Sequence, residues 1–550
     1  ESSQTTEMDQ VRFEGTWELD GGGQFDFGVG YLDTEMSQFN LSTQATLGGW
    51  GVDNPGDIPE GLFEQSCTGC EFENDNEVTG VEGAPGIPLG SVSFNGDSVE
   101  LITEMAPVYG FEAGNLPATG RADNLVEEEI LSAYMQLDID GQLGKFPINT
   151  VFGVRYETTD VDSSSLQQIP QAIRWDSDND FTLILSDNNE SLSEAGSYTN
   201  LLPSLDFSID LRDDLIGRVS FSKTLARPEY DQLFTATSIN SPPRPTALGG
   251  SPSGSVGNAD LDPLESNNVD ISLEWYYGES SFFSVGFYDK RVTNFVGTEQ
   301  VTSPLFGLRD PTSGQEGTLS GDAIAALNDQ GVSVTERNFF TMAAILDNPD
   351  EFPGGTSEFD ESQEFAEEVF SNNAIIANEN DPMFGFELTR PINSRDAKIH
   401  GFEVASQHFF GETGFGYQAN FTTVSGDIGF NRGSDPSQDQ FALEGLSDSA
   451  NLVLIYEKYG ASARLAWNWR DEFLNQVNRS QSSVRNPEFI DDFAQWDMNV
   501  SYDFTDNLTV SFDAINLTEE EVRHFGRTKQ DIFFIQELDR RFLLGARYTF

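Results

Sequence analysis

The chain has 550 residues, of which 29 are Lys or Arg and 92 are Asp or Glu, so its formal net charge is −63. This charge argues against nucleic acid as a partner, because neutralising phosphates requires clustered Lys and Arg. The acidity does not indicate disorder, because 12% of the residues are aromatic and Phe alone counts 44, whereas acidic disordered chains are poor in aromatics.

The chain opens with ESSQTTEMDQ, which is polar and acidic. It lacks the basic start and apolar centre of a signal peptide, so we expect a mature or truncated product. No run of 18 apolar residues occurs in the sequence, which therefore predicts no membrane-spanning helix. A strand of a membrane barrel needs only about ten alternating residues, so a membrane location stays open.

Strict alternation of apolar and polar residues recurs along the chain. At its end, Phe542, Leu544, Ala546, Tyr548 and Phe550 share one face, and the residues between them are mostly polar or small. This period of two predicts β-strands. About 15 strands are predicted in this way, at 9–20, 23–32, 126–139, 145–158, 203–211, 214–225, 264–276, 280–292, 396–409, 413–425, 446–457, 460–470, 493–504, 507–516 and 540–550.

The connections between these strands alternate in length. Short links such as DGGG, RDD, GES, GET, KYG and TD are followed by long ones. The long connections cover 33–125, 159–202, 226–263, 293–395, 426–445, 471–492 and 517–539. Short turns at one end and long loops at the other are typical of an outer-membrane barrel. The predicted fold is therefore an all-β, transmembrane, antiparallel up-and-down β-barrel with an apolar outer face and a polar lumen.

Aromatic residues at the ends of the predicted strands fit the interfacial girdles of such a barrel. They are Trp17, Tyr31, Trp275, Tyr456, Tyr502 and Phe550. The alternative is that they belong to the core of a soluble sheet. Bacterial barrels usually have an even number of strands, so the odd count predicts at least one further strand upstream, with ESSQTTEMDQ in an extracellular loop.

Four stretches resemble the C-terminal part of TonB-dependent outer-membrane receptors. They are LPSLDFSIDLRDDLIGRVSFSKTLARPEYDQL (202–233), GNADLDPLESNNVDISLEWYYGESSFFSVGFYDKRVTNFV (257–296), RPINSRDAKIHGFEVA (390–405) and WDMNVSYDFTDNLTVSFDAINLTEEEVR (496–523) followed by RRFLLGARYTF (540–550). The sequence of these stretches is most similar to the subgroup found in xanthomonads, caulobacters and marine relatives.

The resemblance implies a location in the outer membrane of a Gram-negative bacterium and a 22-stranded barrel filled by an N-terminal plug. It implies coupling to the TonB-ExbB-ExbD complex through a TonB box, contact with lipopolysaccharide, and insertion by the barrel assembly machinery through the last strand, which ends at Phe550. Residues 1–550 would be the C-terminal part of one such barrel, and the plug, the TonB box and the first strands would lie upstream.

The only cysteines, Cys67 and Cys70, lie in SCTGC within an acidic segment. We predict a local loop disulfide, and idle thiols or redox or metal chemistry are the alternatives. Zinc would need further ligands nearby, and the three histidines are far away in sequence. No catalytic motif or phosphate-binding loop is apparent, so neither an enzyme, nor a cofactor, nor a metal site is predicted.

Alternation places one set of charged residues on the predicted lumen face, where they would meet either the plug or water. They are Asp206, Asp210, Arg218, Asp270, Glu274, Arg464, Asp497 and Arg547. ARPEY (226–230) looks like a binding motif, but we favour the alternative that it is a strand exit stiffened by Pro228.

Ligand contacts are expected from loop aromatics with polar neighbours, because ring faces pack on the apolar faces of sugars. The alternative for each is packing within its own loop. The candidates are Trp50, Tyr109, Phe111, Trp175, Phe234, Arg244, Phe339, Phe340, Phe384, Phe473 and Arg479. The 293–395 loop also contains two predicted helical patches, GDAIAALNDQ and SQEFAEEVFSNNA, and could act as a lid.

The predicted function is TonB-energised uptake of a nutrient. Residues 357–382 contain eight acidic residues and no Lys or Arg, and such a mouth repels anions and favours neutral or cationic cargo. This favours an oligosaccharide as the cargo, and a ferric siderophore or other metal chelate is the alternative cargo. A passive porin-like barrel is the alternative to energised uptake. The acidity can also be a general adaptation to saline water, with divalent cations bridging loops to anionic headgroups.

Overall fold

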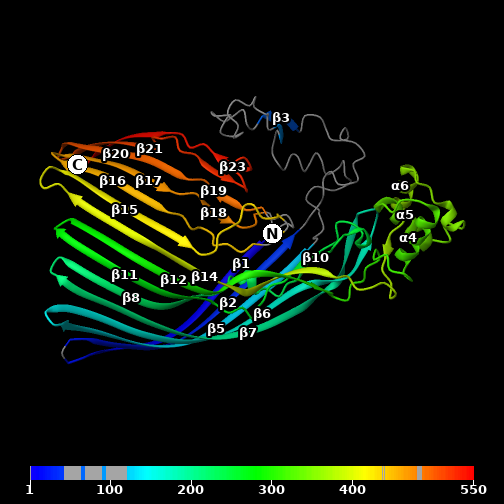
Figure 1. Cartoon of the computed structure of the whole chain (residues 1–550), viewed down its shortest axis with the longest axis horizontal. Coiled ribbons are helices and arrows are strands. Elements are labelled where there is room, and N and C mark those ends of the chain that lie inside the picture. Colours follow the sequence, from blue (N-terminus) through cyan, green and yellow to red (C-terminus); the bar gives the residue numbers. More distant parts are fainter. Residues whose placement is uncertain are drawn as a thin grey trace.

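The computed structural model describes residues 2–20, 22–42, 63–67, 90–94, 120–436, 438, 440–479 and 486–550. These residues build one 18-stranded sheet that curves into an open trough (Figure 1). Fifteen of its strands are antiparallel neighbours in chain order, and the other three, β9, β10 and β13, are short additions. An all-β barrel architecture was the prediction, and this sheet confirms its fold class.

Each predicted strand corresponds to one strand of this meander. The fifteen are β1 (Ser2–Glu18), β2 (Gln24–Ser42), β5 (Gly120–Leu143), β6 (Phe146–Trp175), β7 (Phe181–Arg212), β8 (Leu215–Ala226), β11 (Leu264–Gly278), β12 (Ser281–Ser303), β14 (Phe386–Phe409), β15 (Phe415–Gly426), β16 (Ser449–Lys458), β17 (Ala461–Arg470), β20 (Phe493–Thr505), β21 (Leu508–Ile515) and β24 (Arg541–Tyr548).

The long loops contain smaller elements. Their strands are β3 (Phe63–Cys67), β4 (Gly90–Phe94), β9 (Ser238–Asn240), β10 (Ser253–Ser255), β13 (Ile375–Ile376), β18 (Phe473–Gln476), β19 (Glu488–Ile490), β22 (Val522–Phe525) and β23 (Ile532–Gln536). Their helices are α3 (Tyr230–Leu233), η3 (Thr246–Leu248), α4 (Leu319–Gln330), α5 (Glu336–Asp347), η4 (Gly355–Glu358) and α6 (Gln363–Asn372).

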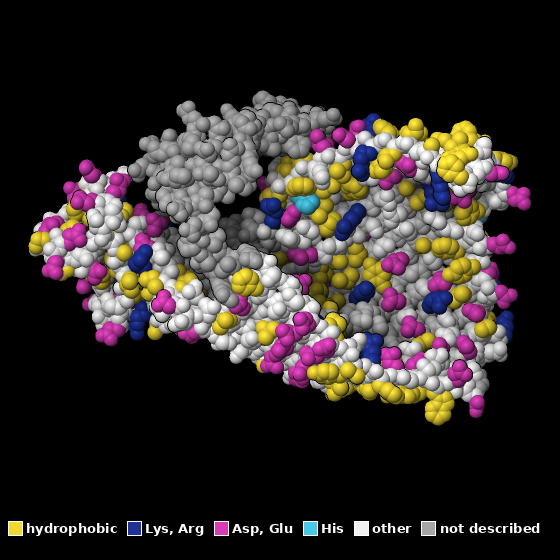
Figure 2. Space-filling model, turned by 180° about the vertical axis from the view of Figure 1, so that it is seen from behind, with side chains coloured by type: hydrophobic (Ala, Val, Ile, Leu, Met, Phe, Trp, Pro, Cys, Tyr) yellow, Lys and Arg dark blue, Asp and Glu magenta, His cyan; other side chains and the backbone are white. Residues whose placement is uncertain are grey.

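The pairing register joins the apolar faces of successive strands into one surface. Leu465 lies opposite Leu454 on one side and Met498 on the other, and the same face continues to Leu544 on β24. Because side chains alternate along a strand, a sheet with this register is apolar on its outer face. The hollow face carries charged side chains of both signs (Figure 2).

Two rows of carboxylates mark where the apolar band ends on the first four strands. Asp9, Asp33, Glu129 and Asp160 lie opposite one another in the first row, and Glu7, Glu35, Glu127 and Asp162 form the second. Acidic side chains gather beside a hydrophobic band on this side of the sheet (Figure 2). Charged side chains are unfavourable in lipid, so the lipid-facing band stops below these rows.

The turns sort by length as predicted. Short turns join β1 to β2, β5 to β6 and β16 to β17 at one end of the trough, and the long loops all leave from the other end (Figure 1). Gly144 and Gly460 have φ angles of 69° and 74° in two of these turns. A left-handed conformation costs glycine nothing, which allows the chain to reverse within two residues.

One prediction about the long loops was wrong, and one helix in them was not predicted. The 159–202 segment is not a loop, because β6 and β7 continue as a hairpin to Trp175 and Phe181. Beyond the lipid band the outer face no longer needs apolar residues, so the alternation fades while backbone pairing continues. The two predicted helical patches correspond to α4 and α6, whereas α5 was not predicted.

The sheet has two free edges. Within the described residues, β1 pairs only with β2, and β24 pairs only with β21. No helix in this part of the chain is both long and apolar enough to span a bilayer. Cys70 and the side chain of Cys67 lie outside the described residues, so the disulfide stays a prediction.

Candidate functional site

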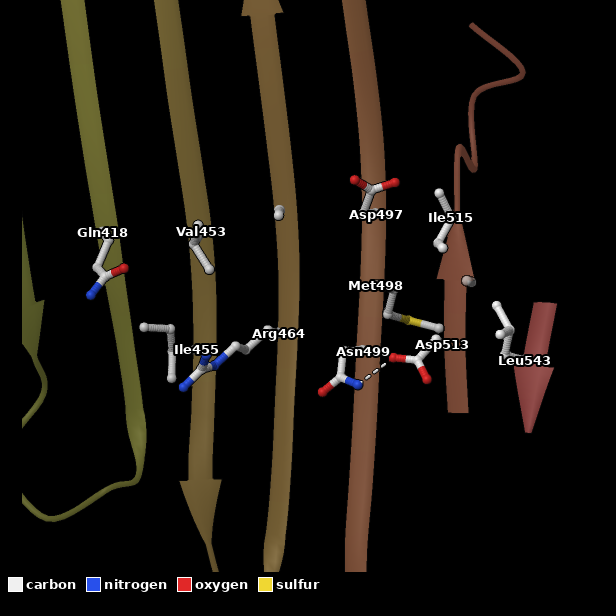
Figure 3. A pocket seen from close by; sticks show the side chains of 12 residues that line it. Gln418, Val453, Ile455, Arg464, Asp497, Met498, Asn499, Asp513, Ile515 and Leu543 are labelled. Carbon is white, nitrogen blue, oxygen red and sulfur yellow. Dashed lines mark hydrogen bonds between the residues drawn. The ribbon is translucent and has the colours of Figure 1, made fainter. Parts of the chain in front are cut away.

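The inner wall of the trough contains a recess of about 570 Å³ between β15 and β24, lined by both apolar and polar side chains (Figure 3). Gln418, Arg464, Asp497, Asn499 and Asp513 project into it from neighbouring strands. Asn499 donates to Asp513 across β20 and β21 at 2.5 Å, and Asp497 accepts hydrogen bonds from the Gln495 amide and the Asn516 backbone. The recess therefore offers both donors and acceptors to whatever fills the trough.

The register places the eight predicted lumen residues on this inner face. Two of them, Arg218 and Glu274, form an ion pair of 3.0 Å between β8 and β11, and Arg464 pairs with Glu457 at 3.1 Å. The set consists of Asp206, Asp210, Arg218, Asp270, Glu274, Arg464, Asp497 and Arg547. Their contact with a plug stays a prediction.

A segment that we call the strap, residues 227–263, folds onto the inner wall near the mouth. Leu233 and Leu261 of the strap are buried against Met36, Val126 and Val161, whose strand positions face inward. Phe234 packs at the edge of this cluster. The strap therefore lies against the inner wall at the entrance of the trough and does not extend away from the sheet.

ARPEY anchors the start of the strap. β8 ends at Ala226, as expected for a strand exit, and the Arg227 guanidinium then pairs with the buried Glu157 carboxylate. Arg155 holds the same carboxylate at 2.8 Å. The Tyr230 hydroxyl donates to Glu128, which is also buried, at 3.4 Å.

Burial shifts the titration of the groups in this anchor, which lie level with the carboxylate rows and outside the lipid-facing band. Burial raises the pKa of the Glu128 carboxyl, although the positive charge of Arg227 opposes the shift. Burial likewise raises the pKa of Tyr198 to about 12. Both groups are therefore more easily kept uncharged than they would be in water.

Helices α4, α5 and α6 form a helical subdomain at the far end of the β6–β7 hairpin (Figure 1). Trp175, from the tip of β6, packs with its ring centroid 5.0 Å from both Phe339 and Phe340 of α5. All three side chains are fully buried. Three predicted ligand contacts therefore lie together, but their ring faces are occupied by one another.

The remaining predicted ligand residues lie apart. Phe384 is buried against Ile173 and Phe386 in a second cluster. Arg244 of the strap pairs with Glu336 at the start of α5, which joins the strap to the helical subdomain. Trp50, Tyr109 and Phe111 lie outside the described residues.

Phe473 lies in a different structure, the small sheet formed by β18, β19, β22 and β23, which we call the C-terminal loop sheet, and Arg479 lies in the turn after β18. Cations from the end of β17 and from the loop between β15 and β16 stack on its aromatic rings. Arg432 lies 3.8 Å from the Phe489 ring and 5.5 Å from the Phe525 ring. Stacks of this kind contribute about 0.5–1 kcal/mol each at exposed sites and about 2 kcal/mol when they are desolvated.

Further cation–ring pairs surround this stack. The Arg470 guanidinium lies 3.7 Å from the Phe473 ring centroid. Arg479 lies 4.9 Å from the Phe533 ring and pairs with Glu488 at 3.3 Å. The Arg432 and Arg479 side chains are partly exposed, so they can meet both a carboxylate of the protein and an incoming group.

The sequence analysis missed Arg432, Arg527 and Lys529 as members of this cluster. The signal was present, because RHFGRTK (523–529) concentrates cations and an aromatic in a chain that has few cations overall. Lys529 donates to Asp491 at 2.6 Å, and this contact raises the pKa of the ammonium group. The Lys529 ammonium group is therefore charged over the pH range of living cells.

Comparison with protein families gives one match, to a model described as "TonB dependent receptor-like, beta-barrel", over residues 2–517. A search of curated proteins finds no match.

Solved structures are similar to this chain at low identity. The ferric-catecholate import receptor Fiu from E. coli K12 matches with a TM-score of 0.50 and 10% identity, over 100% of this chain and 55% of that one. The ferric citrate transporter FecA matches with a TM-score of 0.48 and 12% identity, over 99% and 55%. The copper transporter OprC matches with a TM-score of 0.48 and 12% identity, over 100% of this chain and 57% of that one. The chain thus spans little more than half the length of these proteins.

Proposed function

The chain belongs to the TonB-dependent receptor-like β-barrel family, and from this premise we propose that it is the barrel part of an outer-membrane receptor of a Gram-negative bacterium that takes up a small-molecule nutrient with TonB-supplied energy. The observation that carries the proposal is the outer apolar face, which the register makes continuous from β1 to β24. A lumen lined with charges of both signs accompanies it. That combination suits a wall between lipid and a polar filling.

We further propose that other strands complete the barrel at the free edges of β1 and β24, because lipid leaves an unpaired strand edge unsatisfied. The recess between β15 and β24 would then face a plug, with Arg464 and Asp497 among its contacts. Reading the coding sequence upstream of Glu1 tests this directly. A plug and a TonB box there support energised transport, and a start codon only a few strands away supports a passive porin.

The cargo we propose is an anionic metal chelate rather than an oligosaccharide. Arg432, Arg479 and Lys529 lie beside aromatic rings at the mouth. Each is paired with a carboxylate of the protein but is partly exposed, so an anionic group of a ligand can reach it as well. Guanidinium groups bind carboxylate and other anionic oxygens in a bidentate manner, and rings pack on flat chelating groups. The rings first considered for a sugar, Trp175, Phe339 and Phe340, are enclosed in the helical subdomain and present no free face.

An uptake experiment separates the alternatives. Cells that produce the full receptor are given labelled ferric citrate, a ferric catecholate or a linear glucose hexamer, with and without a protonophore. We expect energy-dependent uptake of a ferric chelate. Energy-dependent uptake of the hexamer would replace the chelate with the sugar, and uptake that ignores the protonophore would favour a porin.

The role of the cluster is tested by Arg479→Gln, since Arg479 is half exposed and pairs with Glu488 only at 3.3 Å. We expect chelate binding to weaken by about tenfold, which corresponds to about 1.4 kcal/mol. The matched control is Arg212→Gln at the short-turn end, where an exposed Arg pairs with Asp214 at 3.2 Å. Equal binding by both variants and the parent would remove the C-terminal loop sheet from the binding site.

A further inference from the structure

Two chain segments meet at the base of the helical subdomain, one entering it from β12 and the other leaving it toward β14. Asp310 donates its backbone N–H to the Pro382 carbonyl at 2.8 Å, and Phe384 donates to the Leu308 carbonyl at 3.0 Å. These bonds bring Asp310 beside Asp381, and both residues are almost completely buried, with exposed fractions of 5% and 2%. Two carboxyl groups are therefore enclosed at one junction.

The hydrogen bonds available at this junction do not satisfy both carboxylates. Asp310 accepts from the Thr312 backbone and hydroxyl, each at 2.8 Å, and from the Thr246 hydroxyl. Asp381 accepts from the Asn378 backbone at 2.8 Å through Oδ2. Its other oxygen, Oδ1, is buried with no hydrogen-bond partner. An orphaned carboxylate oxygen is costly in a protein interior, so it calls for a ligand.

The local charges also lack compensation. The carboxyl groups of Asp310 and Asp381 lie close enough for their negative charges to repel each other. Asp347, the last residue of α5, is exposed and adds a third negative charge near Asp381, at the unfavourable end of the helix dipole. Within the described residues, no Lys or Arg forms an ion pair with these three carboxylates, and Arg309 donates to the backbone carbonyl of Asp381 instead.

We propose that this junction binds a divalent cation, Ca²⁺ in preference to Mg²⁺, with Asp381 Oδ1 as a direct ligand and Asp310 as its neighbour. In the described chain, no three His, Cys, Asp or Glu side chains are grouped to enclose a metal. The remaining ligands must therefore be hydroxyl or carbonyl oxygens and water. Ca²⁺ accepts six to eight such oxygens in irregular geometry, whereas Mg²⁺ demands a near-ideal octahedron. The ion would fasten the entry and exit of the helical subdomain together.

The experiment uses the purified full protein in detergent, stripped with EDTA and tested at pH 7.5. Equilibrium binding of ⁴⁵Ca²⁺ gives the number of bound ions, and limited proteolysis within residues 304–385 reports the junction. We expect Ca²⁺ to slow this cleavage at least tenfold and Mg²⁺ to do less. Asp381→Asn should lose one bound ion and the protection, while it keeps the acceptor for Asn378.

Other acidic residues bind calcium weakly, so the control is Asp360→Asn, an exposed acid of the same subdomain that accepts from the Ser362 backbone. It should match the parent in both measurements. If Asp381→Asn unfolds the subdomain, Asp347→Asn serves instead, since Asp347 is less enclosed, and it should weaken Ca²⁺ protection. Unchanged cleavage of the parent with Ca²⁺, or protection produced only by lowering the pH, would overturn the proposal and assign a proton to the junction in place of the ion.

Discussion

In the strands of the trough the large hydrophobic side chains point away from the protein, whereas in the helical subdomain they point into it. Leu544 and Val11 on the sheet are 81% and 71% exposed, and Phe339 and Phe340 in α5 are not exposed at all. Large hydrophobic side chains are therefore exposed in one region of the chain and buried in the other. The difference indicates two solvents, because an exposed apolar face costs free energy in water but not in lipid.

The largest expected effect comes from breaking the core on the water side. Trp175→Ala removes the ring that α5 packs against, and opening a cavity of this kind costs about 3–5 kcal/mol. We expect α4, α5 and α6 to lose protection in hydrogen exchange while the strands of the trough keep theirs. The comparison variant is Trp275→Ala, whose ring lies on the outer face, 42% exposed. Unchanged protection of the helices in Trp175→Ala would show that the subdomain has another source of stability.

The second prediction places a charge on the lipid side. Leu454 lies within the outer apolar band, and Leu454→Arg should cost about 2–4 kcal/mol of folding free energy in a bilayer. Asn420→Arg is the inward-facing control, on the neighbouring strand, where the Asn451 side chain donates to Asn420. Refolding from urea into liposomes measures both. A larger cost for the inward substitution would reverse the assignment of the two faces.

The same contrast explains which elements could be predicted from the sequence. Strands that face lipid on one side must alternate, so the pattern around Leu544 and Met498 is sufficient to identify their outer faces. Helices α4 and α6 have one buried stripe and were predicted. α5 is buried on every side from Asn338 to Ile345, so it has no polar face and its period is hidden.

The candidate site was harder to predict because its contacts join segments that are distant in sequence. Phe339 and Phe340 were predicted as ligand contacts, and only the fold shows that Trp175 packs against their rings. Arg432 similarly reaches Phe489 and Phe525 from another loop. Composition can indicate that rings and cations are present in the loops, but it cannot tell whether a ring face is free.

The smallest expected effect concerns the strap, where the two regions meet. Glu128 is buried on the inner wall, and burial raises its pKa in the folded protein above that in the unfolded chain. A carboxyl group with a raised folded pKa favours folding below the unfolded pKa, and this contribution is lost as the pH rises through the folded pKa. The parent should therefore hold its strap less firmly at pH 8 than at pH 5.

Glu128→Gln removes the titrating proton but keeps an acceptor for the Tyr230 hydroxyl. We expect this variant to protect the strap from proteolysis equally at pH 5 and pH 8, and to exceed the parent at pH 8. Arg227, Glu157, Arg155 and Tyr198 face the same spot, but Glu157 is already held by two guanidinium groups, whereas Glu128 is buried without such a pair. If the variant kept the pH dependence of the parent, the group that titrates would be another one near the strap, and the assignment to Glu128 would be wrong.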